Sequence, residues 1–158
     1  MNSNELYWLA GLLEGEGSFT MSRGISVRVQ LAMTDKEPVE KAAALMGSKV
    51  TERKVRYDWK LVYRTELCGA EAVRSLLIQL EPLMSPRRKQ AIRKLLQRCS
   101  EVIENRASAK QKAILVRYLV QEMGLSQAYV SKVTGIGDGS VSLVVNGKQN
   151  HIGLIGRR

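Results

Sequence analysis

The stretch Leu9-Ala10-Gly11-Leu12-Leu13-Glu14-Gly15-Glu16-Gly17 decides the fold of this chain. It lies where two hydrophobic periods meet. Before it, apolar residues recur at helical spacing, which predicts a helix from Glu5 to Gly15. After Gly17 the period changes to two, which is typical of strands. The sequence therefore predicts a helix that leads directly into a strand, with Glu14 and Glu16 at the helix end.

The small residues of this helix form a stripe of their own. Gly11 and Gly15 are four residues apart, and Ala10 lies beside them, so a partner helix can approach closely there. A second copy of the stretch is absent from the chain, so a pair of such helices needs two molecules related by a two-fold axis. The helix macrodipole disfavours the two glutamates by some tenths of a kcal/mol each, and we expect a cationic group nearby to compensate.

The chain up to Asn105 is predicted to be an α+β domain with helices on one face of an antiparallel sheet. Its strands alternate apolar and polar side chains, and the clearest case is Ile25 to Met33. The predicted elements after the first helix are a strand around 19–21, a turn at 22–24, a strand at 25–33, a helix from Asp35 to Gly47, a strand pair with its turn at 56–58, and helices at 70–80 and 87–104.

Around residues 105–108 the composition changes, and we predict a domain boundary there, between residues 1–105 and 106–158. The first part has 17 basic and 13 acidic residues, a net charge of +4, and the second has 8 and 2, a net charge of +6. The second part is predicted to hold a helix from Lys110 to Glu122, a helix at 127–134 capped by Ser126, and a third capped by Asp138. The last two helices, joined by a glycine turn, resemble a helix-turn-helix of the phage-repressor type. The alternative is a small helical bundle that only packs on the first domain.

Composition excludes several classes of protein. A net charge of +10 favours polyanionic partners, either nucleic acid or an anionic membrane surface. No apolar run is long enough to span a membrane, and Glu5 stands where a signal peptide would be basic, so we expect no membrane partner. The single histidine, His151, leaves little basis for a zinc finger, a histidine nuclease or a Ser-His-Asp triad. Cys68 and Cys99 lack metal-type spacing and indicate a reducing intracellular compartment, either the cytoplasm of a bacterium or phage host, or an organelle.

The stretch from Leu9 to Gly17, followed by Ser18 and Phe19, resembles the motif that names the LAGLIDADG homing endonucleases, with glutamates in place of aspartates. The resemblance implies an αββαββα domain whose sheet forms a DNA saddle, and a homodimer that cuts double-stranded DNA in intron homing without a small-molecule cofactor. It makes Glu16 the metal ligand, with the Gly15 carbonyl as a second ligand. The expected metal is Mg²⁺, for which Mn²⁺ or Ca²⁺ would substitute in binding. The implied dimer contact comprises Leu9, Ala10, Gly11, Leu12, Glu14 and Gly15.

Two further positions match catalytic roles in that family. Asp35 stands where the family often has a polar residue that contacts metal-bound water, although it is equally suited to cap the helix that follows. Arg87 stands where the family brings a basic residue, usually lysine, toward the scissile phosphate, and Lys89 is nearby. The alternative for both is a generic basic helix start that faces phosphate.

The predicted DNA contacts lie on the polar face of the sheet and in the helix pair, because such side chains suit base edges and phosphates. They are Ser26, Arg28, Gln30, Arg53, Lys60, Arg64, Gln127, Ser140, Ser142 and Lys148. A solvated sheet face is the alternative. The sequence also leaves open two other functions, namely a DNA-binding regulator of the same fold that does not cut and an intron-splicing maturase that binds RNA.

Overall fold

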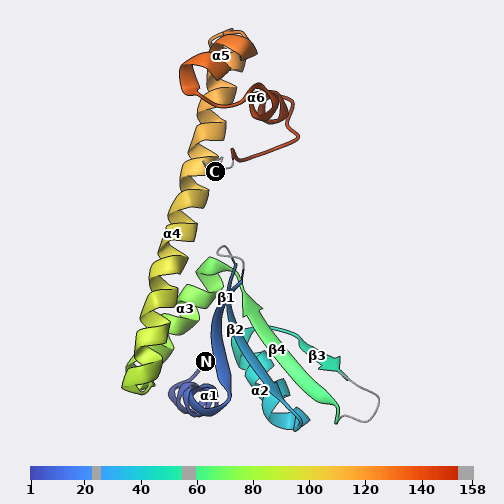
Figure 1. The fold of residues 1–158 in the computed structure, drawn as a ribbon, viewed down its shortest axis with the longest axis vertical. Helices are drawn as coiled ribbons and strands as arrows, with labels where there is room; N and C mark the ends of the chain where they lie inside the picture. Colours follow the sequence, from blue (N-terminus) through green and yellow to red (C-terminus); the bar gives the residue numbers. More distant parts are fainter. Residues whose placement is uncertain (23–25, 55–59, 153–158) are drawn as a thin grey trace. The chain divides into compact units, whose positions relative to one another are not determined.

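The computed structural model describes residues 1–22, 26–54 and 60–152 (Figure 1). The chain divides into two compact units, Met1–Val102 and Ile103–Arg158, which are described separately below as unit 1 and unit 2. The predicted turn at 56–58 and most of the predicted turn at 22–24 lie outside the described residues, as do Ile25 and Trp59.

Unit 1 contains a four-stranded antiparallel sheet in the order β1-β2-β4-β3. The strands are β1 (Gly17–Ser22), β2 (Ser26–Met33), β3 (Val50–Arg53) and β4 (Val62–Cys68). The alternation predicted for β2 is confirmed, since Val27, Val29 and Leu31 are at most 1% exposed, whereas Arg28 and Gln30 between them are half-buried. The sheet therefore has one face in the core and one polar face.

Helices α2 (Lys36–Met46) and α3 (Ala70–Leu80) contact β2 and β4 and so cover the core face of the sheet. The predicted α+β architecture is confirmed. The one buried polar side chain among the described residues, Thr65, accepts or donates a 2.7 Å hydrogen bond with Ser48, so its hydroxyl has a partner in the core. The largest fully buried side chains of this core come from β2, α2, α3 and the helices that precede and follow the sheet, and include Leu9, Leu13, Leu31, Val39, Val73, Leu77, Leu80 and Ile92.

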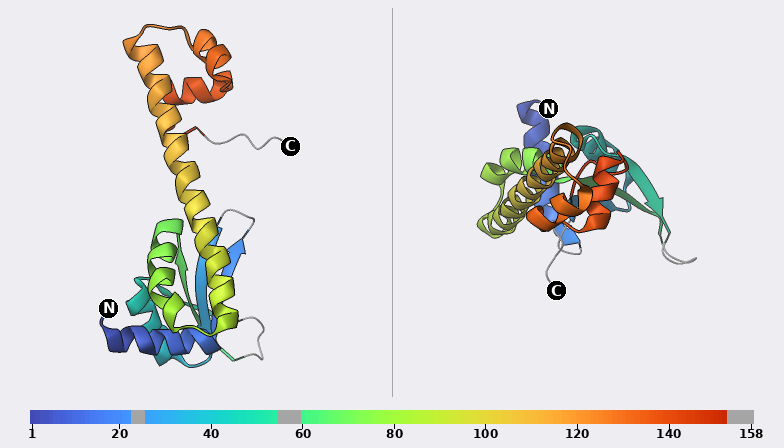
Figure 2. Two further views of the ribbon diagram at one scale, coloured as in Figure 1. Left: turned by 90° about the vertical axis from the view of Figure 1, so that its left-hand side faces the viewer. Right: turned by 90° about the horizontal axis from the view of Figure 1, so that it is seen from above.

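Helix α1 (Ser3–Gly15) lies across the end of the sheet at which β1 begins (Figure 2). It begins with a capping box, in which Asn2 accepts a hydrogen bond from the Glu5 N–H and the Glu5 carboxylate accepts one from the Asn2 N–H. Lys41 of α2 lies 4.1 Å from the centre of the Trp8 ring, a cation–π contact that links α1 to α2. The capping box fixes the start of α1, and the Lys41–Trp8 contact helps to hold the helix, and with it the motif, against α2.

One predicted break is wrong. The helices expected at 87–104 and 110–122 are a single helix, α4 (Pro86–Arg117), which follows a short 3₁₀ turn at Glu81–Leu83 and ends in a π turn at Tyr118–Glu122. The residues between the two predicted helices, 105–109, include neither glycine nor proline, and two of the five are alanine, the best helix former. A change in composition therefore occurs there without a change in secondary structure.

Unit 2 is helical. Ser126 caps α5 (Gln127–Thr134) as predicted, accepting a 3.2 Å hydrogen bond from the Tyr129 N–H, and α5 ends at Gly135 with φ of 67°. The cap predicted for α6 (Asp138–Val145) is wrong, because Gly137 is the N-cap and Asp138 is the first helical residue. There the carboxylate still interacts favourably with the helix dipole. The buried core of unit 2 comprises Ala113, Val116, Val130, Val141, Val144 and Ile152.

Across the described residues, no helix is both long enough and apolar enough to span a membrane.

Candidate functional site

The junction between α1 and β1 is fixed by a close approach at Gly17. A Cβ atom at this position would lie 2.4 Å from the Leu13 carbonyl oxygen and 2.8 Å from the Leu13 Cα, so only glycine fits. Glu16 is the C-cap of α1, and its backbone N–H donates to the Leu12 and Leu13 carbonyls. The chain thus passes from helix to strand within one residue, and Glu16 stands at the turn.

Glu14 is bound within its own chain. Its carboxylate accepts a 3.0 Å hydrogen bond from the Ser85 N–H and a 2.7 Å hydrogen bond from the Ser85 hydroxyl. These bonds, followed by the positive charges of Arg88 and Arg87, hold the pKa of Glu14 below its ordinary value of 4.5 against an opposing effect of burial. Glu14 therefore joins the end of α1 to the segment that precedes α4.

Arg88 supplies the cation expected at this helix end. Its Nε and Nη2 donate to the Glu14 carbonyl oxygen at 3.1 and 2.8 Å, so a positive charge lies on one of the last carbonyls of α1. The same guanidinium lies 5.6 Å from the centre of the Phe19 ring in β1. Arg88 therefore holds the helix and the strand on either side of Glu16.

Sequence reasoning missed both Ser85 and Arg88. A serine before a proline at a helix start is a recognisable N-cap pattern, and the Ser85 hydroxyl does accept a bond from the Arg88 N–H at 3.4 Å. Nothing local could have paired these residues with Glu14, because 71 and 74 positions separate them. Only the folded chain brings the two segments together.

Glu16 differs from Glu14. Its side chain is exposed, and among the described residues it forms no hydrogen bond or ion pair. Nor do three His, Cys, Asp or Glu side chains converge anywhere in the described part of the chain. A carboxylate oxygen is the hard ligand that Mg²⁺ prefers, and Mg²⁺ is commonly held by one or two carboxylates with water and phosphate oxygens. The chemistry of the Glu16 carboxylate thus fits a ligand of such an ion.

Of the other predicted catalytic residues, Arg87 and Lys89 lie on either side of Arg88 in sequence, and Asp35 lies at the start of α2. Asp35 occupies the N-cap position of α2, but its side chain makes no capping hydrogen bond and is exposed. Arg87 is exposed at the start of α4 and lies close enough to lower the pKa of Glu14. Lys89 is half-buried in the same helical turn. Their catalytic roles stay predictions.

The residues predicted for a dimer contact divide into two groups. Leu9 and Ala10 are 0% and 4% exposed, and their side chains lie in the core of their own chain. Gly11 and Gly15 are exposed, and a Cβ atom at either would meet nothing within 4 Å. Leu12 is half-buried. Within one chain, the open part of the stripe consists of these two glycines.

The polar face of the sheet carries a cluster of charged side chains. Arg28 Nη1 lies 2.9 Å from Glu66 Oε1, and Arg64 Nη2 lies 2.6 Å from Glu66 Oε2. The Cys68 thiol donates to Glu66 Oε1 at 2.9 Å. The thiol and the two guanidinium groups lower the pKa of Glu66, although burial opposes them. Arg28 and Arg64 of this cluster were predicted as site residues, whereas Glu66 and Cys68 were not.

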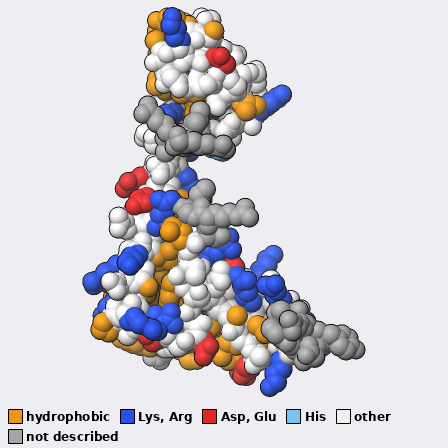
Figure 3. Space-filling model, viewed as in Figure 1, with side chains coloured by type: hydrophobic (Ala, Val, Ile, Leu, Met, Phe, Trp, Pro, Cys, Tyr) orange, Lys and Arg blue, Asp and Glu red, His pale blue; other side chains and the backbone are white. Residues whose placement is uncertain are grey.

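The remaining predicted DNA contacts are distributed over both units. In unit 1, Ser26 and Gln30 are half-buried on the polar face, while Arg53 and Lys60 are exposed. Basic side chains are spread over the side of unit 1 seen in Figure 3, with few acidic ones between them. In unit 2, Gln127, Ser140 and Ser142 are half-buried and Lys148 is exposed.

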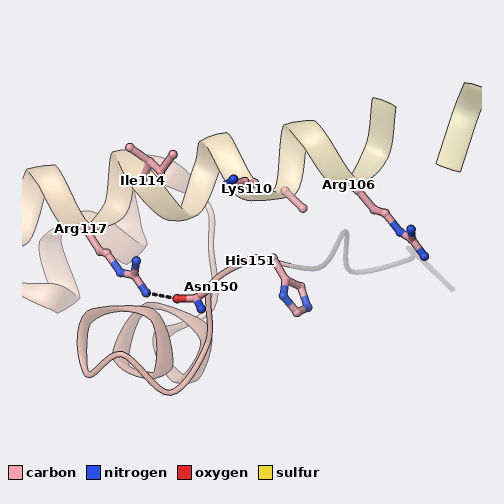
Figure 4. Close-up of a pocket in the computed structure, with 7 residues that line it drawn as sticks. Arg106, Lys110, Ile114, Arg117, Asn150 and His151 are labelled. Atoms are coloured by element: carbon pink, nitrogen blue, oxygen red, sulfur yellow. Dashed lines mark hydrogen bonds between the residues drawn. The ribbon is translucent and has the colours of Figure 1, made fainter. Parts of the chain in front are cut away.

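Unit 2 also has a hollow of about 570 Å³ lined by Arg106, Ala109, Lys110, Ile114, Arg117, Asn150 and His151 (Figure 4). Arg117 closes one end of it, because its guanidinium donates to the Val144 and Gln149 carbonyls at 3.0 and 3.1 Å and to Asn150 Oδ1 at 2.6 Å. Arg117 therefore holds the segment after α6 against α4 within this unit.

Comparisons with known proteins agree with this architecture. Residues 3–80 match the model of a family described as "LAGLIDADG-like domain". A crystal structure of the homing endonuclease I-CvuI with the I-CreI target, in the presence of Mg and with the DNA not cleaved, is 17% identical with a TM-score of 0.51, over 73% of this chain and 77% of that one. A crystal structure of I-CvuI with its target in the presence of Ca is 17% identical with a TM-score of 0.52, over 96% of this chain and 90% of that one. No curated protein matches the sequence.

Proposed function

We propose that this chain, whose residues 3–80 match the LAGLIDADG-like domain, belongs to the LAGLIDADG family and is a sequence-specific, metal-dependent endonuclease that cuts both strands of duplex DNA as a homodimer. The observation that carries the proposal is the state of Glu16. Its side chain is exposed and has no partner among the described residues, whereas the close approach at Gly17 and the bond from Arg88 to the Glu14 carbonyl fix the backbone on either side of it. A carboxylate held at a rigid junction but left without a partner is suited to bind a cation.

The metal would be bound by the Glu16 carboxylate and the Gly15 carbonyl of each subunit. Mg²⁺ is the ion we propose, with Mn²⁺ or Ca²⁺ as substitutes in binding, since the two I-CvuI structures were obtained in the presence of Mg or Ca. When bound, such an ion supplies charge stabilisation to the attacking and leaving oxygens of a phosphodiester. The exposed Asp35 carboxylate would accept a hydrogen bond from water, and Arg87 and Lys89 would stabilise negative charge on the phosphate.

The homodimer would form through α1. Gly11 and Gly15 leave an open strip on the exposed side of this helix, where a second α1 can approach, and Leu12 borders it. Leu9 and Ala10 support the strip from within the core. Because the Glu14 carboxylate is already bound to Ser85, its part in the dimer would be to keep each α1 end in place.

The DNA would lie against the polar face of the sheet, with unit 2 as a second contact. Arginine and glutamine on strands suit base edges, and lysine and arginine also neutralise phosphates. The proposed contacts are Ser26, Arg28, Gln30, Arg53, Lys60 and Arg64 in unit 1, and Gln127, Ser140, Ser142 and Lys148 in unit 2. Cys68 and Cys99 are both free thiols, which supports an intracellular, reducing compartment for this protein.

A second candidate function is DNA binding without cleavage, as in a transcriptional regulator. The pair α5 and α6, joined by Gly135, Ile136 and Gly137, favours it, because this arrangement resembles the reading unit of repressors. Glu16 favours the nuclease, because a regulator has no use for an unengaged carboxylate near phosphate.

A cleavage selection separates these functions. The full chain is incubated with a randomised duplex library with Mg²⁺ or with EDTA, cut molecules are sequenced, and the oligomeric state on the recovered site is measured by light scattering. We expect cleavage of both strands only with Mg²⁺, by two chains per site. Retention of duplex DNA without cutting would support the regulator, and preference for a structured RNA over duplex DNA would support a maturase.

A further inference from the structure

Glu66 lies at the centre of the polar face of the sheet and uses both of its carboxylate oxygens. Oε1 contacts Arg28 and Cys68, and Oε2 contacts Arg64. The strand register creates this arrangement, because Arg28 of β2 is paired with Cys68 of β4, two residues from Glu66, and Gln30 is paired with Glu66 itself. One acidic side chain thus joins two arginines on neighbouring strands.

The cluster is more constrained than an ordinary surface ion pair. Its three charged side chains are between 22% and 32% exposed, whereas ion pairs on an open surface are mobile and contribute little. Arg28 Nε is buried and has no hydrogen-bond acceptor within the described part of the chain. The Nε side of the guanidinium is therefore enclosed, and only Nη1 and Nη2 can donate to a ligand.

The charge of Glu66 works against simple DNA affinity. A carboxylate on a surface that meets phosphate repels the polyanion and cancels one of the two arginine charges. Its benefit lies in orientation, because a free arginine loses much side-chain entropy when it is fixed against a base, and an arginine already held by a carboxylate loses less.

We propose that Glu66 determines sequence specificity by positioning Arg28 and Arg64 as a pair of guanine readers. Each guanidinium presents several N–H donors and uses one nitrogen for Glu66, so others remain for the O6 and N7 acceptors of guanine in the major groove. Glu66 is a positioning residue, which acts on DNA through the two arginines. This inference rests on the proposed function and specifies guanine as the base that the two arginines recognise.

The experiment compares two variants of Glu66 in the full chain. Binding is measured for the preferred duplex from a randomised library and for one duplex of arbitrary sequence, and discrimination is the ratio of the two affinities. Glu66→Gln removes the negative charge, so we expect tighter binding to the arbitrary duplex and discrimination reduced by about 10-fold, concentrated at guanine positions. Glu66→Asp keeps the charge but shortens the reach, so we expect lost discrimination without the gain in non-specific affinity.

Glu52→Gln is the matched control. Glu52 is exposed in the same sheet, but it is paired with Tyr63 and so lies on the face opposite Arg64. We expect this variant to keep the discrimination of the native chain. Thermal unfolding of each variant shows whether the fold is retained, and Glu66→Asp keeps the test decisive if Glu66→Gln unfolds.

The outcomes separate this inference from the proposed function. If Glu66→Asp discriminates as well as the native chain, Glu66 contributes only charge and the inference is wrong, although DNA binding stands. If the native chain shows no preference among duplexes, both the inference and the proposed function are wrong.

Discussion

Glu14 and Glu16, both at the end of α1, differ in their contacts. On one side, Glu14 is bound by Ser85 and its carbonyl is bound by Arg88. On the other side, Glu16 projects without a partner among the described residues. The same residue type two positions apart therefore serves the fold in one case and is available for chemistry in the other. The difference shows that the role of an acidic residue in such a motif depends on its contacts in the folded chain as well as on its position in the sequence.

The largest expected effect comes from Glu16→Gln, which removes the charge of Glu16 and leaves the hydrogen bonds of Glu14 with Ser85 and Arg88 intact. Loss of partners that merely orient metal ligands already costs about 10–100-fold, so we expect loss of a direct ligand to reduce cleavage by more than about 100-fold. Affinity for the selected duplex should stay within about 3-fold, because no positive contact is removed. Cleavage and binding are measured on the same duplex, and cutting at the native rate would refute the role of Glu16.

Arg88→Met tests the contacts that hold the end of α1, and its main effect should be on the stability of the fold. It removes two hydrogen bonds from a charged donor to the Glu14 carbonyl and the cation at the end of α1, so we expect a loss of about 2 kcal/mol in the free energy of unfolding. Urea denaturation measures this loss. Arg87→Met is the control, because Arg87 is exposed and we expect a change of less than about 0.5 kcal/mol. Equal effects of the two variants would show that Arg88 has no special part.

Glu14→Gln should cost less, about 1 kcal/mol, because the amide oxygen can still accept a bond from Ser85 and the site is partly solvated. The comparison predicts that this variant loses stability while Glu16→Gln does not. The same urea experiment measures both. A larger loss in Glu16→Gln would reverse our assignment of the two side chains.

The smallest effect is the pH dependence of that loss. The pKa of Glu14 is lowered in the folded chain, so its contribution to stability is fully present above 4.5 and is lost as the pH falls through the folded value. The difference in stability between the native chain and Glu14→Gln should therefore shrink below pH 4.5. Unfolding curves at neutral and acidic pH measure it, and a difference that does not change with pH would contradict the assigned cause.

Local patterns in the sequence were enough to predict the sheet and the helices around it. The alternation in β2, the helix that ends at Gly47 and the helix at 70–80 were all predicted, because each depends on neighbours along the chain. The continuity of α4 was not, since a change in composition was read as a change in structure. The links of Glu14 to Ser85 and of Glu66 to Arg28 were also missed, because they join distant segments whose pairing depends on tertiary packing.

Two glycines of the motif, Gly11 and Gly17, should behave differently in a genetic screen. Alanine at position 17 would collide with the Leu13 backbone, so a reporter of folding should reject it. Alanine at position 11 meets no atom within its own chain and gains about 1 kcal/mol of helix propensity, so the same reporter should accept or even favour it. A screen for activity should reject both. Mutational tolerance under the two selections would thus distinguish a glycine required by the single molecule from one required by the pair.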